Sequence, residues 1–267
     1  GGISMSALAE ICINKGYNVS GSDMHGSELT EKLASQGAKI FIGHAKENIS
    51  DDIDIVVYTA AIHPDNPELI EAKNKNKLTI NRAAFLGQLM REYKNSIAVS
   101  GTHGKTTTTG MLTQLFIQAG KDPSAIIGGK LPFIGSNGRA GKSDIMICEA
   151  CEYVDTFLKL SPAISIILNI DADHLEYFGS LENIIKSFHQ FSNQTGKVLI
   201  VNGDDENVKK AIKGIQGVKI ITFGMGADND YSAANIKEEP NVFEDFTLMK
   251  QGAPLTDIRL SVPGKHN

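Results

Sequence analysis

One glycine-rich segment, Gly101-Thr102-His103-Gly104-Lys105-Thr106, constrains the fold of this chain more than any other feature. It follows a β-rich run at 96–100 and precedes an apolar-striped helical run at 105–119. A strand, a glycine turn and a helix in this order predict a phosphate-binding loop, because the N–H groups and the dipole at a helix start attract anions. Val99 stands where the general pattern has its first glycine, so the segment matches a narrower Gly-Thr-x-Gly-Lys-Thr form.

The residues of this loop suit the phosphates of ATP. Lys105 would lie against the β- and γ-phosphates, and the hydroxyl of Thr106 would reach Mg²⁺. The alternative is a glycine turn that caps a helix and leaves the lysine solvated, but an apolar helix directly after Gly-Lys-Thr favours the phosphate site. We therefore expect ATP and Mg²⁺ as cofactors, bound by the loop residues Gly101, Thr102, His103, Gly104, Lys105, Thr106 and Thr107.

Helical and strand patterns alternate along most of the chain, which predicts an α/β fold with a mostly parallel sheet. We expect a small doubly wound domain at 1–93 and a second domain at 94–267. Helices are expected at 5–14, 27–36, 67–76, 82–92, 105–119, 181–193 and 205–213. Strands are expected at 17–20, 39–42, 54–58, 96–100, 144–149, 163–168, 197–201 and 218–223. From about residue 230 the alternation changes and predicts a small antiparallel excursion with strands at 230–237, 242–249 and 255–261.

Charge and composition narrow the function classes. With 26 basic and 31 acidic residues the net charge is −5, which argues against a nucleic-acid binder with a basic face. No apolar run reaches the length of about 18 residues that a membrane span needs, and no leader pattern is present. Three cysteines do not make a disulfide framework, so we expect a reducing cytoplasm. The chain begins without a methionine or a preceding strand, and we expect it to be a fragment.

A glycine pair opens the chain directly before a helical pattern. Gly1-Gly2-Ile3-Ser4-Met5 precedes this helix, and Ser22-Asp23 follows about 20 residues later at an expected strand end. This arrangement resembles the second half of a dinucleotide-binding fingerprint. An ordinary capped helix remains an alternative, because the preceding strand is missing from the chain.

Polar residues also follow two apolar strands of the second half. Glu149 ends the strand at 144–149, while Asn169 and His174 follow the strand at 163–168. The carboxyl ends of parallel strands meet at one edge of a sheet, where a carboxylate can hold Mg²⁺ and a neutral histidine a second metal. A surface acid and a solvated loop histidine are the alternatives. We interpret Cys148 and Cys151 as incidental, because no second cysteine pair accompanies them.

Three segments together resemble the Mur ligase family. They are Gly-Thr-His-Gly-Lys-Thr-Thr-Thr-Thr (101–109), Glu-Ala-Cys-Glu-Tyr-Val-Asp-Thr-Phe-Leu (149–158) and Asn-Ile-Asp-Ala-Asp-His-Leu-Glu (169–176). The opening glycines, Asn137-Gly138-Arg139 and the closing Pro-Gly-Lys-His-Asn add to the likeness, which covers essentially the whole chain. The resemblance implies a Rossmann-like domain for the UDP substrate without its first strand, a truncated P-loop-type ATPase domain, and the absence of the C-terminal domain that brings the amino acid.

The resemblance also implies an activity. The motifs are most like those of the branch that joins L-alanine to the carboxylate of UDP-N-acetylmuramate through an acyl phosphate, using ATP and Mg²⁺ in peptidoglycan synthesis. Two alternatives stay open: a related ligase that attaches a recycled murein peptide to the same sugar nucleotide, and a nucleotide-binding fragment without turnover. We expect the isolated chain to be inactive, and we expect neither a nucleic-acid nor a membrane partner.

Site residues carry over from the family by motif. Lys105, Glu149 and His174 are the expected catalytic residues, and Thr106, Glu149 and His174 the expected metal ligands. Asn169 is expected beside the nucleotide. The substrate-binding residues implied are Gly1, Gly2, Ser4, Met5, Ser22, Asp23, His103, Asn137 and Arg139.

Overall fold

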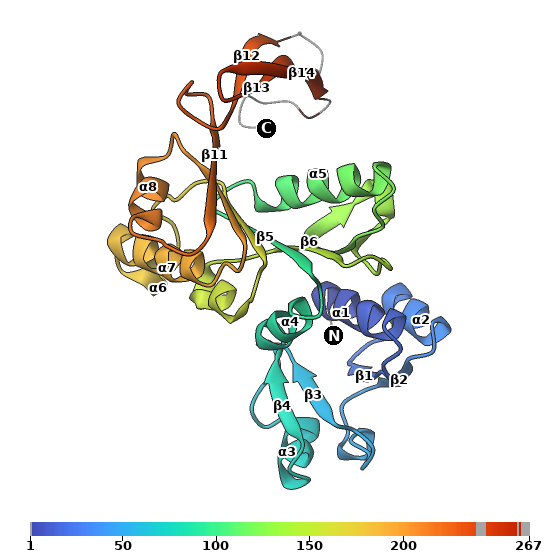
Figure 1. Cartoon of the computed structure of the whole chain (residues 1–267). Helices are drawn as coiled ribbons and strands as arrows, with labels where there is room; N and C mark the ends of the chain where they lie inside the picture. The colour runs from blue at the N-terminus through green and yellow to red at the C-terminus, as the bar shows by residue number, and fades with distance from the viewer. Residues whose placement is uncertain (1, 239–243, 261, 263–267) are drawn as a thin grey trace. The chain divides into compact units, whose positions relative to one another are not determined.

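The computed structural model describes residues 2–238, 244–260 and 262. The chain divides into two compact units, each treated by itself below (Figure 1). The first unit comprises residues 1–96, 109–149 and 159–161, and the second comprises 97–108, 150–158 and 162–267. The domain boundary expected at residue 93 stays a prediction.

The N-terminal part of the first unit alternates helices and short parallel strands. Its helices are α1 (Ile3–Asn14), α2 (Glu28–Ser35), the 3-10 turn η1 (Lys46–Asn48), α3 (Pro67–Asn74) and α4 (Arg82–Met90). Its strands form two parallel pairs, β1 (Ser20–Asp23) with β2 (Lys39–Ile42), and β3 (Ile55–Tyr58) with β4 (Leu78–Asn81). All the helices expected here are present, whereas β4 was not expected.

Local capping explains where these helices begin. The Ser27 hydroxyl accepts the N–H of Thr30, whose side chain in turn accepts the N–H of Ser27, so a capping box opens α2. Asn66 caps α3, which has Pro67 at its first position, where the missing N–H costs nothing. The Asn81 side chain accepts the N–H of Ala84 and caps α4.

The strand expected at 17–20 was placed too early. Tyr17 closes helix α1 instead, because its N–H donates to the carbonyl of Cys12 while Gly16, with φ 85°, turns the chain. The strand β1 therefore runs from Ser20 to Asp23, and it carries Ser22 and Asp23 at its carboxyl end.

The first unit also contains most of α5 (Lys105–Gln118), with β6 (Ser124–Leu131), the turn η2 (Pro132–Ile134), β7 (Ser136–Arg139) and β8 (Ile145–Glu149). Strand β6 pairs in parallel with β8 and antiparallel with β7. Neither β6 nor β7 was expected, because their glycines (Gly128, Gly129 and Gly138) weaken the strand pattern. Gly138 is needed for packing, since a Cβ there would lie 2.3 Å from the Cβ of Ala7 on α1.

The second unit is built on a mostly parallel sheet. In order, β11 (Lys219–Gly224), β10 (Val198–Asn202), β9 (Ile164–Ile167) and β5 (Asn95–Ser100) pair in parallel. Strand β12 (Tyr231–Glu238) pairs with β11 and continues antiparallel into β13 (Glu244–Lys250) and β14 (Ala253–Leu260). This confirms the α/β class and the antiparallel excursion, although positions 242, 243 and 261 of the expected strands lie outside the described residues.

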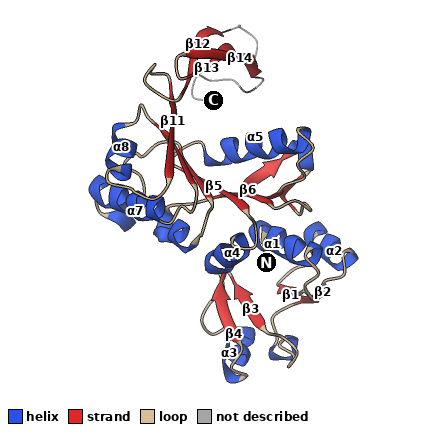
Figure 2. Ribbon diagram, viewed as in Figure 1, coloured by secondary structure: helices blue, strands red, loops and turns tan. Residues whose placement is uncertain are grey.

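Four helical segments accompany this sheet, and an aromatic cluster joins two of them. The segments are the 3-10 segment η3 (Tyr153–Lys159), α6 (Leu175–Phe178), α7 (Leu181–Asn193) and α8 (Glu206–Ile212), and α7 contacts α8 (Figure 2). Phe157 stacks on Phe191 at a ring-centroid distance of 4.7 Å and meets Phe188 edge-on at 5.1 Å. These three rings are fully buried, so they anchor η3 to α7.

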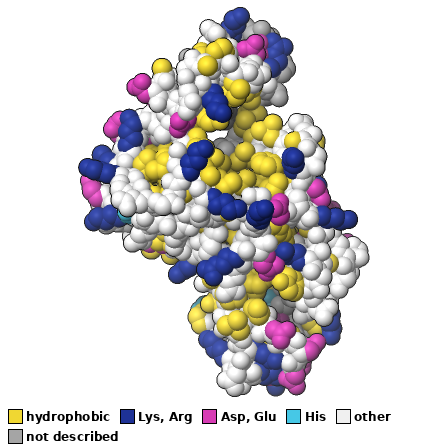
Figure 3. All heavy atoms as spheres, in the orientation of Figure 1, with side chains coloured by type: hydrophobic (Ala, Val, Ile, Leu, Met, Phe, Trp, Pro, Cys, Tyr) yellow, Lys and Arg dark blue, Asp and Glu magenta, His cyan; other side chains and the backbone are white. Residues whose placement is uncertain are grey.

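On the face shown in Figure 3, basic and acidic side chains are interspersed. Among the described residues, no helix combines the length and the apolar character that a bilayer crossing requires.

Candidate active site

The glycine-rich segment forms the turn between β5 and α5, as expected from the sequence. Gly101 and Gly104 have φ values of 140° and 86°, which glycine adopts readily. A Cβ on Gly101 would also lie 3.0 Å from the Cβ of Leu168, so the loop needs glycine at this position for space as well. The helix α5 begins at Lys105, and its first N–H groups face the loop as an anion site requires.

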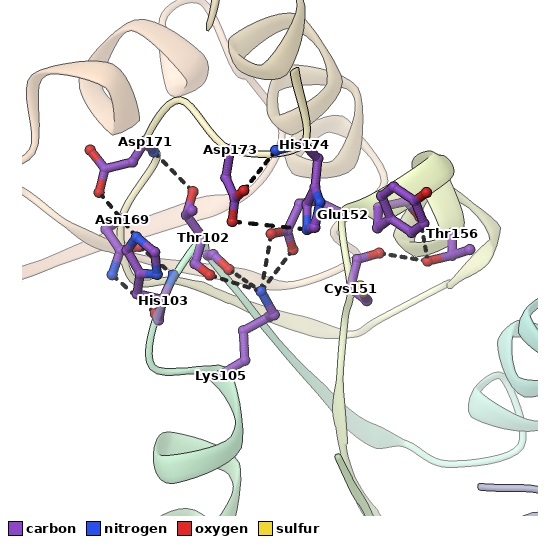
Figure 4. A network of polar contacts seen from close by, with 12 residues as sticks. Thr102, His103, Lys105, Cys151, Glu152, Thr156, Asn169, Asp171, Asp173 and His174 are labelled. Atoms are coloured by element: carbon purple, nitrogen blue, oxygen red, sulfur yellow. Dashed lines mark hydrogen bonds and ion pairs between the residues drawn. The ribbon is translucent and has the colours of Figure 1, made fainter. Parts of the chain in front are cut away.

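The Lys105 ammonium is held by four oxygens at the base of the loop (Figure 4). Its Nζ donates to the carbonyls of Gly101 at 2.6 Å and Thr102 at 3.1 Å. It also lies 3.0 and 2.9 Å from the two carboxylate oxygens of Glu152. Glu152 is only 2% exposed, so this ion pair is largely shielded from water.

Glu152 is a residue that sequence reasoning did not assign. It follows the expected acid Glu149 by three positions and directly precedes η3, which is kinked near its start. Val154 and Asp155 have φ values of 52° and 54°, the left-handed region that a β-branched residue rarely adopts. Two signals were available: the charge itself, shortly after an apolar strand, and the position of Glu152 within the segment 149–158 that carries the family resemblance.

The segment after β9 clamps the phosphate loop. Asn169 accepts the N–H of His103 at 2.8 Å and donates from Nδ2 to the carbonyl of His103 at 3.1 Å. Thr102 accepts the N–H of Asp171 on its hydroxyl at 2.9 Å and donates its own N–H to the carbonyl of Asn169. Asn169 therefore lies at the loop, where it fixes the backbone of His103.

His174 stands in a second strained stretch beside the loop. Its φ is 52°, and its ring lies 4.6 Å from that of Tyr153 between centroids. Asp155 accepts from the Tyr177 hydroxyl at 2.8 Å and from the hydroxyl of Ser187, which holds η3 in place. Non-glycine residues in the left-handed region are strained and persist only where the surrounding structure holds them, and such residues cluster at functional sites.

The expected metal ligands are oxygen and nitrogen donors of suitable chemistry. Thr106 is exposed at the start of α5, and His174 is partly exposed within the second unit. Glu149 belongs to the first unit, where its Oε1 accepts the N–H of Gly128 at 2.6 Å. Among the described residues no three His, Cys, Asp or Glu side chains are grouped as metal ligands. A nucleotide-bound Mg²⁺ fits the oxygen donors of Thr106 and Glu149, because it takes few protein oxygens and keeps phosphates and waters as ligands, whereas His174 offers a ring nitrogen.

The residues expected to bind the UDP moiety lie at the start of α1 and at the end of β1. Gly1 is outside the described residues, and Gly2 precedes α1 with φ 84° and no side-chain cap. Ser4 and Met5 form the first turn of α1. Ser22 donates its hydroxyl proton to Glu68 at 2.6 Å, and Asp23 accepts the N–H of His25 at 3.3 Å.

Two further expected substrate residues have protein partners. Asn137 is 4% exposed and donates to the carbonyl of Ile127 at 3.3 Å. Arg139 pairs with Asp122 and donates from Nε to the carbonyl of Pro123 at 3.0 Å. Arg139 also lines a hollow of about 290 Å³ together with Glu10 and Lys32 of the same unit.

The three cysteines are free thiols. Burial raises the pKa of Cys148 to about 12, with the charge of Glu149 adding to the effect. Burial likewise raises the pKa of Cys12 to about 11, while Cys151 is exposed. Cys148 and Cys12 therefore carry no thiolate at neutral pH.

A glycine loop between a buried parallel strand and a helix, with a lysine on a buried acid and a clamping asparagine, defines a nucleotide-phosphate-binding protein of the α/β class. Comparison with known families makes this class specific. Residues 1–94 match the domain described as "Mur ligase family, catalytic domain", and residues 99–267 match the "Mur ligase middle domain". The chain belongs to the Mur ligase family.

Curated relatives agree with the family. The chain is 49% identical over 269 residues to the UDP-N-acetylmuramate–L-alanine ligase of Clostridium botulinum (strain Langeland) and covers 58% of that protein. It is 47% identical over 271 residues to the ligase of the same name from Acetivibrio thermocellus and covers 57% of it. In both comparisons the match includes 100% of this chain. The chain thus spans somewhat more than half the length of these relatives.

Solved structures show the same fold. The UDP-N-acetylmuramate–alanine ligase of Thermotoga maritima is 31% identical with a TM-score of 0.79, and the match covers 100% of this chain and 60% of that one. The UDP-N-acetylmuramate:L-alanyl-gamma-D-glutamyl-meso-diaminopimelate ligase of Neisseria meningitides is 22% identical with a TM-score of 0.84, and the match covers 100% and 86%. The second likeness concerns the fold alone.

Proposed function

We propose that this chain supplies the ATP-binding and UDP-substrate-binding parts of an ATP-dependent ligase. The whole protein joins L-alanine to the carboxylate of UDP-N-acetylmuramate through an acyl phosphate, in the cytoplasmic stage of peptidoglycan synthesis. The phosphate loop carries the proposal: Lys105 lies at its base with the ammonium held by Glu152, and an ammonium beside such a loop suits neutralisation of a transferred phosphoryl group. The names of the relatives at 46–49% identity support the choice of L-alanine.

The proposed reaction requires little covalent participation by the protein. ATP transfers its γ-phosphoryl group to the substrate carboxylate, and the amine then attacks the acyl phosphate and expels phosphate. Phosphoryl transfer needs alignment and charge neutralisation, which the loop N–H groups and the Lys105 ammonium provide. Asn169 keeps the loop in its binding shape through both hydrogen bonds to His103.

Bound Mg²⁺ would supply positive charge that offsets the charge of the phosphates. We propose Thr106 and Glu149 as its oxygen ligands, and His174 as a further ligand through a neutral ring nitrogen. Because Lys105 is already paired with Glu152, a metal ion is the natural second source of positive charge for the transferred group.

The UDP part of the sugar nucleotide would occupy the first unit. We propose that Gly2, Ser4, Met5, Ser22 and Asp23 bind the UDP part, since an acid at the end of the second strand of such a domain contacts ribose hydroxyls. His103, Asn137 and Arg139 are proposed for the sugar and its carboxylate. Arg139 has a guanidinium suited to a carboxylate, although Asp122 already occupies part of it.

The test is phosphate release from ATP by the protein at the full length of its relatives. We expect release to require both UDP-N-acetylmuramate and L-alanine. Release that depends on a murein peptide instead of L-alanine would identify the related recycling ligase. No release with either amine would indicate a nucleotide-binding protein without turnover.

A further inference from the structure

One carboxylate of the first unit joins four separate segments. Glu68, the second residue of α3, accepts the hydroxyl proton of Ser22 on Oε2 at 2.6 Å. Its Oε1 accepts Nδ2 of Asn48, in η1, at 2.7 Å. His44, just after β2, brings Nδ1 to 3.0 Å from the Ser22 Oγ and 3.3 Å from Glu68 Oε2. The side chain of Glu68 is 14% exposed, so these contacts are sheltered.

These contacts fix the direction of the Ser22 hydroxyl. An ionised carboxylate can only accept hydrogen bonds, so the proton of Ser22 points at Glu68. His44 then donates from Nδ1, since the Ser22 oxygen and the carboxylate both accept. Toward a ligand, Ser22 can therefore act only as an acceptor, which suits a hydroxyl or N–H group and does not suit a phosphate oxygen.

We propose that Glu68 is a positioning residue of the sugar-nucleotide site. It holds Ser22 as the acceptor for a donor group of the nucleoside, either a ribose hydroxyl or the uracil N–H. This inference rests on the proposed function, which places the UDP moiety at the end of β1.

The contact with Asn48 explains why a carboxylate is needed at residue 68. Nδ2 of Asn48 also donates to the carbonyl of Gly43 at 3.2 Å, so this amide presents its donor end to Glu68. A glutamine at 68 has one accepting and one donating end. It would either meet Asn48 donor against donor, or turn its own NH₂ toward Ser22 and reverse the serine hydroxyl.

The experiment is a double-mutant cycle on UDP affinity, measured by calorimetry on the chain. Glu68→Gln and Ser22→Ala are each expected to weaken UDP binding about tenfold, the effect of one lost hydrogen bond to an oriented group. Glu68→Gln added to Ser22→Ala is expected to cause no further loss, because Glu68 acts through Ser22. Full additivity of the two effects, or unchanged UDP affinity in Glu68→Gln, would overturn the proposal.

Glu68→Asp serves as the second variant if Glu68→Gln does not fold, because it keeps the charge but withdraws the carboxylate from Ser22. It should give the same non-additive loss with Ser22→Ala. Glu71→Gln is the matched control on the same helix; it pairs with Lys75 and should leave UDP affinity unchanged. If the wild-type chain binds no UDP, the proposed function fails; if it binds UDP and the cycle is additive, only the role of Glu68 fails.

Discussion

The ammonium of Lys105 lies 2.9 and 3.0 Å from the two carboxylate oxygens of Glu152. With the carbonyls of Gly101 and Thr102, four acceptors surround a group that has three N–H bonds. Glu152 thus fixes the lysine at the base of the phosphate loop. Its negative charge also weakens the attraction between the Lys105 ammonium and a bound phosphate.

Removal of Lys105 should therefore affect stability as well as nucleotide binding. Lys105→Met leaves Glu152 buried without its counter-charge, and we expect a loss of about 3 kcal/mol in the free energy of unfolding. The double variant Lys105→Met with Glu152→Gln should recover most of this loss, as measured by urea denaturation. Equal stability of Lys105→Met and wild type would show that the pair contributes nothing to the fold.

Gly87 should not tolerate alanine, although alanine is the better helix former. A Cβ at Gly87, in α4, would lie 1.9 Å from the carbonyl oxygen of Lys159. We expect Gly87→Ala to lower the free energy of unfolding by about 1–3 kcal/mol through overpacking. Gly196→Ala is the control, because its Cβ would meet its neighbours at 3.6 Å, an ordinary contact. A thermal unfolding midpoint for Gly87→Ala that equals wild type would contradict this packing.

Val154 should be replaceable with a gain in stability. Its φ of 52° costs a β-branched residue about 1–2 kcal/mol, and the residue is 47% exposed, so little burial is lost. Val154→Asn is expected to raise the unfolding midpoint, because asparagine adopts this region more easily. A lower midpoint in calorimetry would mean that the contacts of Val154 stabilise the fold by more than its backbone strain costs.

The cysteines should differ sharply in reactivity. Burial holds the pKa of Cys148 at about 12 and that of Cys12 at about 11, so both thiols stay protonated at pH 8. Iodoacetamide is therefore expected to label Cys151 alone in the native chain, and all three after denaturation, as read by mass spectrometry. Native labelling of Cys148 would contradict the burial of β8.

The sequence predicted those parts of the protein whose signals are local. The loop at 101–106 was recognisable because glycine, lysine and threonine spacing coincides with a strand and a helix start. Strands β6 and β7 were missed, because Gly128 and Gly138 are required by packing with distant residues and weaken the strand pattern.

The site was predictable only in part, because several of its contacts join residues that lie far apart in the sequence. Glu152 contacts Lys105 across 47 positions, and it directly precedes a left-handed turn that no residue type in Tyr153–Asp155 predicts. Glu68 contacts Ser22 across 46 positions, and such a pairing depends on the assembled fold. Residues that act through other residues are therefore the ones that the sequence pattern leaves unmarked.

The most direct test of the account is the thermal stability of the chain with Mg-ATP and, separately, with UDP-N-acetylmuramate. A ligand that binds only the native state, at a free concentration 100 times its dissociation constant, adds about 2.7 kcal/mol to the free energy of unfolding. We predict a higher unfolding midpoint with each ligand, loss of the Mg-ATP shift alone in Lys105→Met, and loss of the sugar-nucleotide shift alone in Asp23→Ala. No shift with either ligand would contradict both site assignments.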